Sequence, residues 1–104
     1  MKLLYITVED EKEAENLASK LLEKGLIACG NIYSMKSIYR WNGNVEKEPE
    51  TVLLAKTSSE KVEMAREEVA KLHSYDIPCI LTIDANANED FLNWIKEETS
   101  SKPK

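Results

Sequence analysis

The sequence predicts an α+β fold, in which four antiparallel strands form one sheet and helices pack against it. Three observations lead to this prediction. Asn42-Gly43 lies between two runs of strand-forming residues and is the strongest short-range hairpin signal, because both residues tolerate the positive φ of a type I′ turn. A segment with apolar residues at helical spacing lies on either side of this hairpin. Short β-branched runs begin and end the series, which gives the order β-α-β-β-α-β.

The first strand is predicted over Lys2–Glu9, a short apolar run with β-branched residues that suits a central position in the sheet. Asp10 with Glu13 three residues later resembles a capping box and predicts the start of the first helix. The apolar residues of this helix follow at helical spacing and are Ala14, Leu17, Ala18, Leu21 and Leu22. Gly25 has the C′ position at which helices commonly end.

The hairpin runs from Leu26 to Thr57, and its first arm alone would reach roughly 50 Å at about 3.3 Å per residue. A compact chain of this length has a radius of gyration of about 13 Å and cannot cover such a ribbon. The outer half is therefore expected to project and to need another surface over it, which predicts self-association. Breaks in the ladder are expected at Ser34-Met35-Lys36 and at Pro49, because proline cannot donate to a ladder.

Thr57-Ser-Ser-Glu60 matches a second capping box, and the apolar stripe after it predicts a helix that continues to about His73. Ile77–Asp84 is predicted as the fourth strand, interrupted early by Pro78. Asn88 is predicted to cap a last, short helix, which is added after the fourth strand.

This order is the split βαβ arrangement of ferredoxin-like domains, and right-handed crossovers place the strands in the spatial order 4-1-3-2. Cys29 on the second strand and Cys79 on the fourth then lie on opposite sheet edges, roughly 14 Å apart. A disulfide needs Cα atoms within about 7 Å, so no bridge is expected within the chain.

With 104 residues, of which 42% are hydrophobic and 32% charged, the chain has the composition of one soluble globular domain. We expect this domain to span 1–98 and residues 99–104 to form a flexible tail whose polar side chains offer nothing to bury. The net charge of −5 argues against nucleic acid as a partner and permits cations. Neither a secretory signal nor a membrane-spanning run is recognised, so a cytoplasmic location without membrane contact is expected.

The sequence has no phosphate-binding glycine loop and no nucleophile elbow, and its single histidine is His73. A Cys–His pair lacks a third orienting group by spacing, so we expect no catalytic residue. Metal ligation is the sharper alternative, because thiolate and imidazole suit copper and zinc. The simplest interpretation of Cys29 is a small buried residue, and that of His73 is a donor to the last carbonyls of a helix. For Cys79, packing and reactivity are both open.

Ser37, Tyr39 and Trp41 alternate along the ribbon and share one face, where subunit packing is favoured over ligand stacking. Glu50 and Lys56 are charges within an apolar strand, which are tolerated mainly when paired. They can pair across the ribbon or between subunits, or orient a small ligand.

Motifs in fixed order over about Leu3 to Glu98 resemble the CutA family of divalent-cation-tolerance proteins. These motifs are Leu26-Ile-Ala-Cys-Gly-Asn-Ile32, Ser37-Ile-Tyr-Arg-Trp-Asn-Gly43 with Glu46 and Glu50, Lys56-Thr57, His73-Ser-Tyr-Asp-Ile-Pro78 and Phe91-Leu-Asn-Trp94. The resemblance implies a ferredoxin-like subunit in a homotrimer whose long ribbons pair with neighbours. It also implies tolerance of copper and other divalent cations, with no obligatory cofactor.

By position, the resemblance places Cys29 and His73 where metal binding is implicated in the family. It also implies a surface around the subunit junction, made of Tyr39, Trp41, Glu50, Lys56 and Tyr75. Ser74 departs from the family pattern, in which proline follows the motif histidine, and Cys79 stands where glutamate is usual. If that glutamate helps to bind a cation, this chain has replaced a hard ligand by a soft one.

These observations lead to the hypothesis of a cytoplasmic homotrimer that binds divalent or soft transition cations weakly, at Cys29, His73 and Cys79, and contributes to metal tolerance. One alternative is a PII-like signalling trimer that binds a small anionic metabolite in intersubunit clefts near Lys56, Tyr75 and His73. Another is a non-catalytic trimeric scaffold that displays surfaces to another protein.

Overall fold

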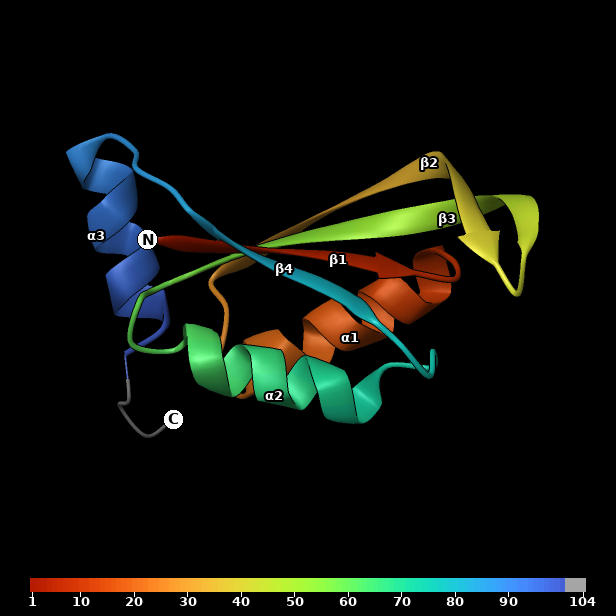
Figure 1. The fold of residues 1–104 in the computed structure, drawn as a ribbon. Coiled ribbons are helices and arrows are strands. Elements are labelled where there is room, and N and C mark those ends of the chain that lie inside the picture. The colour runs from red at the N-terminus through yellow and green to blue at the C-terminus, as the bar shows by residue number, and fades with distance from the viewer. Residues whose placement is uncertain (101–104) are drawn as a thin grey trace.

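The computed structural model describes residues 1–100 and contains the elements in the predicted order, which Figure 1 shows as a ribbon. The strands are β1 (Lys2–Val8), β2 (Cys29–Trp41), β3 (Asn44–Thr57) and β4 (Cys79–Asp84). The helices are α1 (Glu11–Glu23), α2 (Val62–Leu72) and α3 (Glu89–Glu98). The α+β fold with an added C-terminal helix is therefore confirmed.

The strands form one sheet in the order β2-β3-β1-β4, which is the predicted arrangement with β1 in the middle. All neighbouring strands are antiparallel, and β1 pairs with β3 from Lys2↔Thr57 to Val8↔Thr51. Figure 1 shows α1 and α2 on one face of the sheet and α3 at one end of it. The opposite face of the described sheet is open along most of its length.

The hydrophobic core lies between the sheet and the pair α1 and α2. Side chains alternate along a strand, so β1 directs Leu4, Ile6 and Val8 toward the helices, and all three are 0% exposed. The helices contribute the apolar stripes that the sequence predicted, with Ala14, Leu17, Ala18 and Leu21 from α1 and Val62, Ala65 and Val69 from α2.

Helix α1 begins and ends as predicted. Asp10 Oδ1 accepts a hydrogen bond from the Glu13 amide at 2.8 Å, and Glu13 Oε1 accepts one from the Glu9 amide at 3.1 Å. Gly25 has a φ of +69°, and the amide of the next residue donates to the carbonyl of Leu21 at 2.9 Å. This is the Schellman arrangement, which satisfies the last carbonyls of the helix.

The predicted capping box at the start of α2 does not form, and the helix begins later, at Val62. The Thr57 hydroxyl donates instead to the carbonyl of Leu26 at 2.7 Å, in a buried contact. The prediction was wrong because the buried Thr57 side chain is directed toward Leu26, 31 residues away in the sequence, and not toward the first turn of α2. Asn88 is the N-cap residue of α3, but its side chain makes no capping hydrogen bond.

The folded domain extends past Glu98. Thr99, which the sequence assigned to the tail, is 2% exposed and donates a hydrogen bond to the Ile95 carbonyl at 2.8 Å. Its Oγ1 also lies 3.0 Å from Ser58 Oγ. The rest of the predicted tail, residues 101–104, lies outside the described residues. Within residues 1–100, the helices are too short or too polar to cross a membrane.

The hairpin turns at Asn42 and Gly43 with φ angles of 51° and 81°, as a type I′ turn requires. The register runs without interruption from Cys29↔Lys56 to Trp41↔Asn44, so the breaks predicted at 34–36 and at Pro49 are wrong. Counted from the turn, Pro49 stands at a pair whose amides face away from the partner strand. Because β1 has already ended at this point, the missing amide of Pro49 costs the sheet no hydrogen bond.

The outer half of the hairpin projects from the body, as predicted. β1 pairs with β3 only as far as Thr51, so residues 35–50 extend past the three-stranded part of the sheet. The molecule measures 46 × 26 × 20 Å. Ile38, Trp41 and Val45 on the ribbon are 64%, 49% and 60% exposed. A single chain therefore leaves the ribbon uncovered.

Candidate functional site

A groove of about 980 Å³ lies between the ribbon and the end of the sheet where β1 finishes and β4 begins. Strand alternation turns every second residue of β2 and β3 toward it. The ribbon lines the groove with Met35, Ser37, Ile38, Tyr39, Trp41, Glu46, Glu48 and Glu50. The body lines it with Tyr5, Thr7, Glu9, Ser74, Tyr75, Asp76, Ile77 and Cys79.

The groove is electronegative. Its carboxylates are Glu9, Glu46, Glu48, Glu50 and Asp76, and among the residues that line it in the described chain there is no lysine, arginine or histidine. Walls of one charge sign concentrate ions of the other sign. The sulfur atoms of Met35 and Cys79 add soft ligand atoms to this lining.

Glu50 joins the ribbon to the body of the domain. Its Oε2 accepts a hydrogen bond from the Tyr75 hydroxyl at 2.8 Å, and its Oε1 accepts one from the Ser37 hydroxyl. Burial raises the pKa of Tyr75 above its usual range, and the hydrogen bond to Glu50 raises this pKa further. Two hydroxyl donors thus satisfy the strand carboxylate that the sequence expected to be paired.

Alkaline titration should report the Tyr75 contact. An unfolded tyrosine loses its proton near pH ~10, whereas folded Tyr75 retains it above that pH. The folded state then binds more protons, so the free energy of unfolding falls as the pH rises above about 10. We expect Tyr75→Phe to remove part of this fall in urea unfolding at about pH 8 and about pH 11. The unmodified protein is the control, and identical slopes in the two proteins would contradict the contact.

His73 is the C-cap residue of α2, and its fully buried ring lies with its centre 4.8 Å from that of Tyr75, which lines the groove. Its Nδ1 accepts a hydrogen bond from the Tyr75 amide at 3.1 Å, and its Nε2 donates to the Thr7 carbonyl at 2.7 Å. This pattern requires the neutral ring with its proton on Nε2. The ring therefore binds β1, and the prediction that it donates to the last carbonyls of α2 was wrong. Both nitrogens are engaged within the chain, so metal ligation by His73 would require these contacts to open.

Cys29 and Cys79 lie at opposite corners of the sheet. Cys29 begins β2 opposite Lys56, whereas Cys79 begins β4 opposite Thr7. The two residues are separated by three strand spacings across the sheet and by about four residues along the strands. Together these offsets place their Cα atoms roughly 20 Å apart. Both thiols are free, which confirms that there is no disulfide between them. Both are also half-buried, so the prediction that Cys29 is buried does not hold within one chain.

One chain does not bring all the predicted site residues together. The groove gathers Tyr39, Trp41, Glu50, Tyr75 and Cys79. Lys56 Nζ instead lies 5.6 Å from the ring centre of Phe91, at the α3 end of the sheet. Lys56 therefore does not lie near Tyr75 and His73 within one chain, and the cleft predicted between subunits stays a prediction. Nowhere in residues 1–100 do three or more histidine, cysteine, aspartate or glutamate side chains converge to hold a metal ion.

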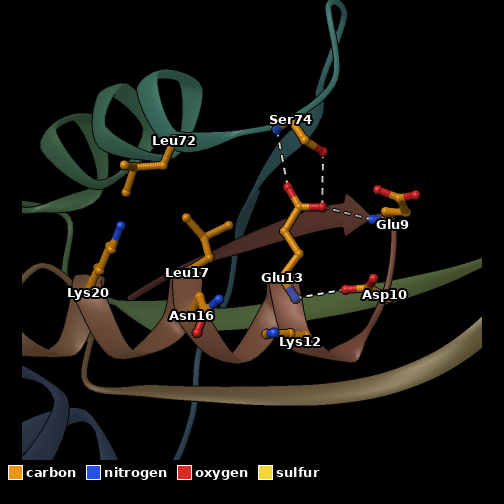
Figure 2. A pocket seen from close by; sticks show the side chains of 9 residues that line it. All are labelled: Glu9, Asp10, Lys12, Glu13, Asn16, Leu17, Lys20, Leu72 and Ser74. Atoms are coloured by element: carbon orange, nitrogen blue, oxygen red, sulfur yellow. Dashed lines mark hydrogen bonds between the residues drawn. The ribbon is translucent and has the colours of Figure 1, made fainter.

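Glu13 holds the segment after α2, a role that sequence reasoning missed. Glu13 is one of the residues that line a hollow of about 390 Å³, and Figure 2 shows these residues from close by. Its carboxylate accepts hydrogen bonds from the Ser74 hydroxyl at 3.0 Å and the Ser74 amide at 3.1 Å. Proline at position 74 would supply neither donor. The departure from the family pattern at Ser74 is the signal in the sequence from which this contact could have been found.

Comparison with known proteins agrees with this structure. A family model described as CutA1 divalent ion tolerance protein matches residues 2–98. The divalent-cation tolerance protein CutA of Archaeoglobus fulgidus is 44% identical over 95 residues, which cover 90% of this chain and 93% of that protein.

Solved structures show the same fold. The periplasmic divalent cation tolerance protein CutA from Archaeoglobus fulgidus has a TM-score of 0.92 at 42% identity, covering 96% of this chain and 100% of that one. The PII-like protein CutA from a Nostoc species, in apo form, has a TM-score of 0.89 at 29% identity, covering 95% of this chain and 97% of that one. The family model and the identity over nearly the whole chain show that this protein belongs to the CutA1 family of divalent ion tolerance proteins.

Proposed function

We propose that this protein contributes to divalent-cation tolerance by binding divalent or soft transition cations weakly, as a cytoplasmic homotrimer. The observation that carries the proposal is the groove, which carboxylates and the Cys79 thiol line without a basic side chain from the described chain. A cation entering this groove is attracted by the carboxylates, and thiolate favours copper or zinc among the divalent ions. The names of relatives in the same family support this function.

Binding to a single chain is expected to be weak. Because three ligand side chains do not converge anywhere in the described part of the chain, a cation would bind to at most two protein ligands and to water. Cys79 lines the body end of the groove together with Glu9 and Asp76. Cys29 lies at the far corner of the sheet and would reach this end only from another subunit.

The homotrimer is supported by the surfaces that a single chain leaves uncovered. On the open face of the sheet, Tyr33, Leu81 and Ile83 are 46%, 50% and 39% exposed. The projecting ribbon adds Tyr39 and Trp41, which are 37% and 49% exposed. Extended apolar surface of this kind marks an interaction site. We propose no catalytic role, because the hydrogen bonds of His73 engage both of its ring nitrogens.

Calorimetric titration of copper(II) or zinc(II) into metal-free protein tests the cation site. We expect saturable binding that Cys79→Ser weakens by at least about tenfold, because the soft ligand is lost. Asp76→Asn should weaken it further. Glu67→Gln, on the exposed side of α2, removes the same charge far from the groove and is the matched control. Unchanged affinity in Cys29→Ala, His73→Ala and Cys79→Ala would remove all three proposed ligands.

A second candidate function is the binding of a small organic ligand, as in a PII-like protein. The Nostoc neighbour described as PII-like favours it, and the groove volume lies near the top of the range of about 300 to 1,000 Å³ for ligand pockets. Since the lining is acidic, the ligand would be cationic or neutral, in place of the anionic metabolite first considered. Thermal stabilisation by an organic amine without metal would favour this function, and stabilisation only by anions would contradict it.

A further inference from the structure

The hollow that Glu13 lines lies between α1 and the end of α2. Its volume of about 390 Å³ is within the range of about 300 to 1,000 Å³ that is usual for ligand pockets. The groove adjoins it, because Glu9 and Ser74 line both. The two differ in charge, since the hollow has the basic side chains Lys12 and Lys20 as well as carboxylates. The hollow therefore suits a different class of ligand.

The end of the hollow near the start of α1 is acidic. Glu9, Asp10 and Glu13 bring three carboxylates to it, against the single cation of Lys12. The carboxylate of Glu13 is held by hydrogen bonds from the Ser74 amide, the Ser74 hydroxyl and the Glu9 amide. The Glu9 carboxylate and Oδ2 of Asp10 make no hydrogen bond to any residue within 1–100. An ammonium group, with its three N–H donors, would meet one held carboxylate and two free acceptors at this end.

The other end of the hollow is basic. Lys20 follows Glu13 by seven residues and therefore lies on the same face of α1, two turns away. Figure 2 shows Leu17 between these two side chains and Leu72 near Lys20. Within residues 1–100 the Lys20 ammonium forms no ion pair. A carboxylate at this end would meet an unpaired cation, and apolar surface joins the two ends.

We propose that the hollow binds a small ω-amino carboxylate, which has an ammonium group at one end of a short aliphatic chain and a carboxylate at the other. The ammonium group would bind Glu9 and Glu13, the carboxylate would bind Lys20, and the chain would lie over Leu17 and Leu72. A purely cationic ligand would leave Lys20 unpaired, and a purely anionic one would face the three carboxylates. This site goes beyond the proposed cation binding, which uses the groove.

The length of the ligand follows from the helix. Two turns separate Glu13 from Lys20 by about 10 Å along the axis. Charge-assisted hydrogen bonds of about 2.8 Å at each end leave roughly 5 Å for the ligand, and the flexible Lys20 side chain adds a few ångströms. An extended chain advances about 1.2 Å per bond, so five or six bonds between the two charged groups span about 6 to 7 Å. An α-amino acid, whose charged groups are two bonds apart, is too short to reach both ends.

Titration of 6-aminohexanoate into nitrogen-15-labelled protein, followed through the amide chemical shifts, tests this site. We expect saturable shifts at Glu13, Asn16 and Ser74 that share one midpoint. Hexylamine lacks the carboxylate and hexanoate lacks the ammonium group. Each should therefore bind at least about tenfold more weakly, since one charged contact is lost. Glycine carries both charges too close together and should bind at least as weakly as these two.

Two variants assign the ends of the hollow. Lys20→Met should lower the affinity for 6-aminohexanoate to about that of hexylamine and leave hexylamine binding unchanged. Glu13→Gln should weaken the binding of both compounds. Lys96→Met and Glu89→Gln are the matched controls, because they make the same changes in the last and first turns of α3. Both controls should bind like the unmodified protein, and circular dichroism verifies that each variant is folded.

Cys79→Ser separates this site from the groove, because Cys79 lines the groove and not the hollow. This variant should bind 6-aminohexanoate like the unmodified protein. Four outcomes would overturn the site: shifts that rise without saturation, hexylamine binding as tightly as 6-aminohexanoate, unchanged affinity in Lys20→Met, and weakened affinity in Cys79→Ser. None of them bears on cation binding in the groove, which the metal titration tests.

Discussion

Replacing residues 36–49 by the dipeptide Asn-Gly is expected to convert the assembled protein into a folded monomer. The core cluster identified within residues 1–100 is built entirely from residues outside this segment, so the body should keep its packing. Hydrogen-bonded and non-hydrogen-bonded pairs alternate along an antiparallel ladder. Trp41↔Asn44 next to the turn is a hydrogen-bonded pair, and Met35↔Glu50, six pairs further along, is therefore hydrogen-bonded as well. A two-residue type I′ turn can therefore close the shortened hairpin without a change of register.

Sedimentation velocity at micromolar concentration measures this change directly. The full chain should sediment as a trimer and the shortened chain as a monomer, because the removed segment carries the exposed Ile38, Tyr39, Trp41 and Val45 of the projecting ribbon. The shortened chain should keep its helical circular dichroism and unfold cooperatively, which is the control for folding. A shortened chain that still formed trimers would show that the open face of the sheet, and not the ribbon, holds the copies together.

Ile6→Ala should cause the largest loss of stability of any single change considered for this protein. Ile6 is 0% exposed on the central strand and lies between Leu53 of β3 and Ile80 of β4. Truncating such a side chain removes buried methylene groups and leaves a cavity, which should lower the free energy of unfolding by about 3 to 4 kcal/mol. Guanidinium unfolding at one fixed protein concentration measures this loss, because association adds to the apparent stability.

Leu81→Ala is the matched control on the opposite face of the sheet. Leu81 is 50% exposed in one chain, so its truncation should cost little at low protein concentration. If another subunit covers the open face, the cost should grow as the concentration rises into the range where the protein associates. An equal, concentration-independent loss in Ile6→Ala and Leu81→Ala would contradict the division into a core face and an interaction face.

Three predictions from short-range patterns in the sequence were confirmed by the structure. Asp10 caps α1, Gly25 ends it, and Asn42-Gly43 turns the hairpin. Each of these effects acts between residues that are neighbours in the chain, so no knowledge of the fold is needed. The strand order also followed from the element order, because crossovers are right-handed and the hairpin must be antiparallel.

The failed predictions depended on partners far away in the sequence. The Thr57 hydroxyl is bound by the carbonyl of Leu26, which a search for a capping box cannot reveal. Pro49 leaves the ladder intact because β1 ends before reaching it. This depends on the register between β1 and β3, which the residue type at position 49 does not reveal. His73 donates to the carbonyl of Thr7 on β1, which is 66 residues away in the sequence and is brought near only by the fold.

In the candidate site, too, the features set by neighbouring residues could be predicted, and those set by distant residues could not. The sequence by itself determined the fold class, the length of the ribbon and the alternation that places Tyr39, Trp41 and Glu50 on one face, because these follow from local backbone preferences and the period of a strand. Only the tertiary structure decided that Cys79 faces this surface and that Lys56 lies beside Phe91 at the far end of the sheet. The register of three antiparallel pairings sets those distances, and it depends on contacts between residues that are remote in the chain.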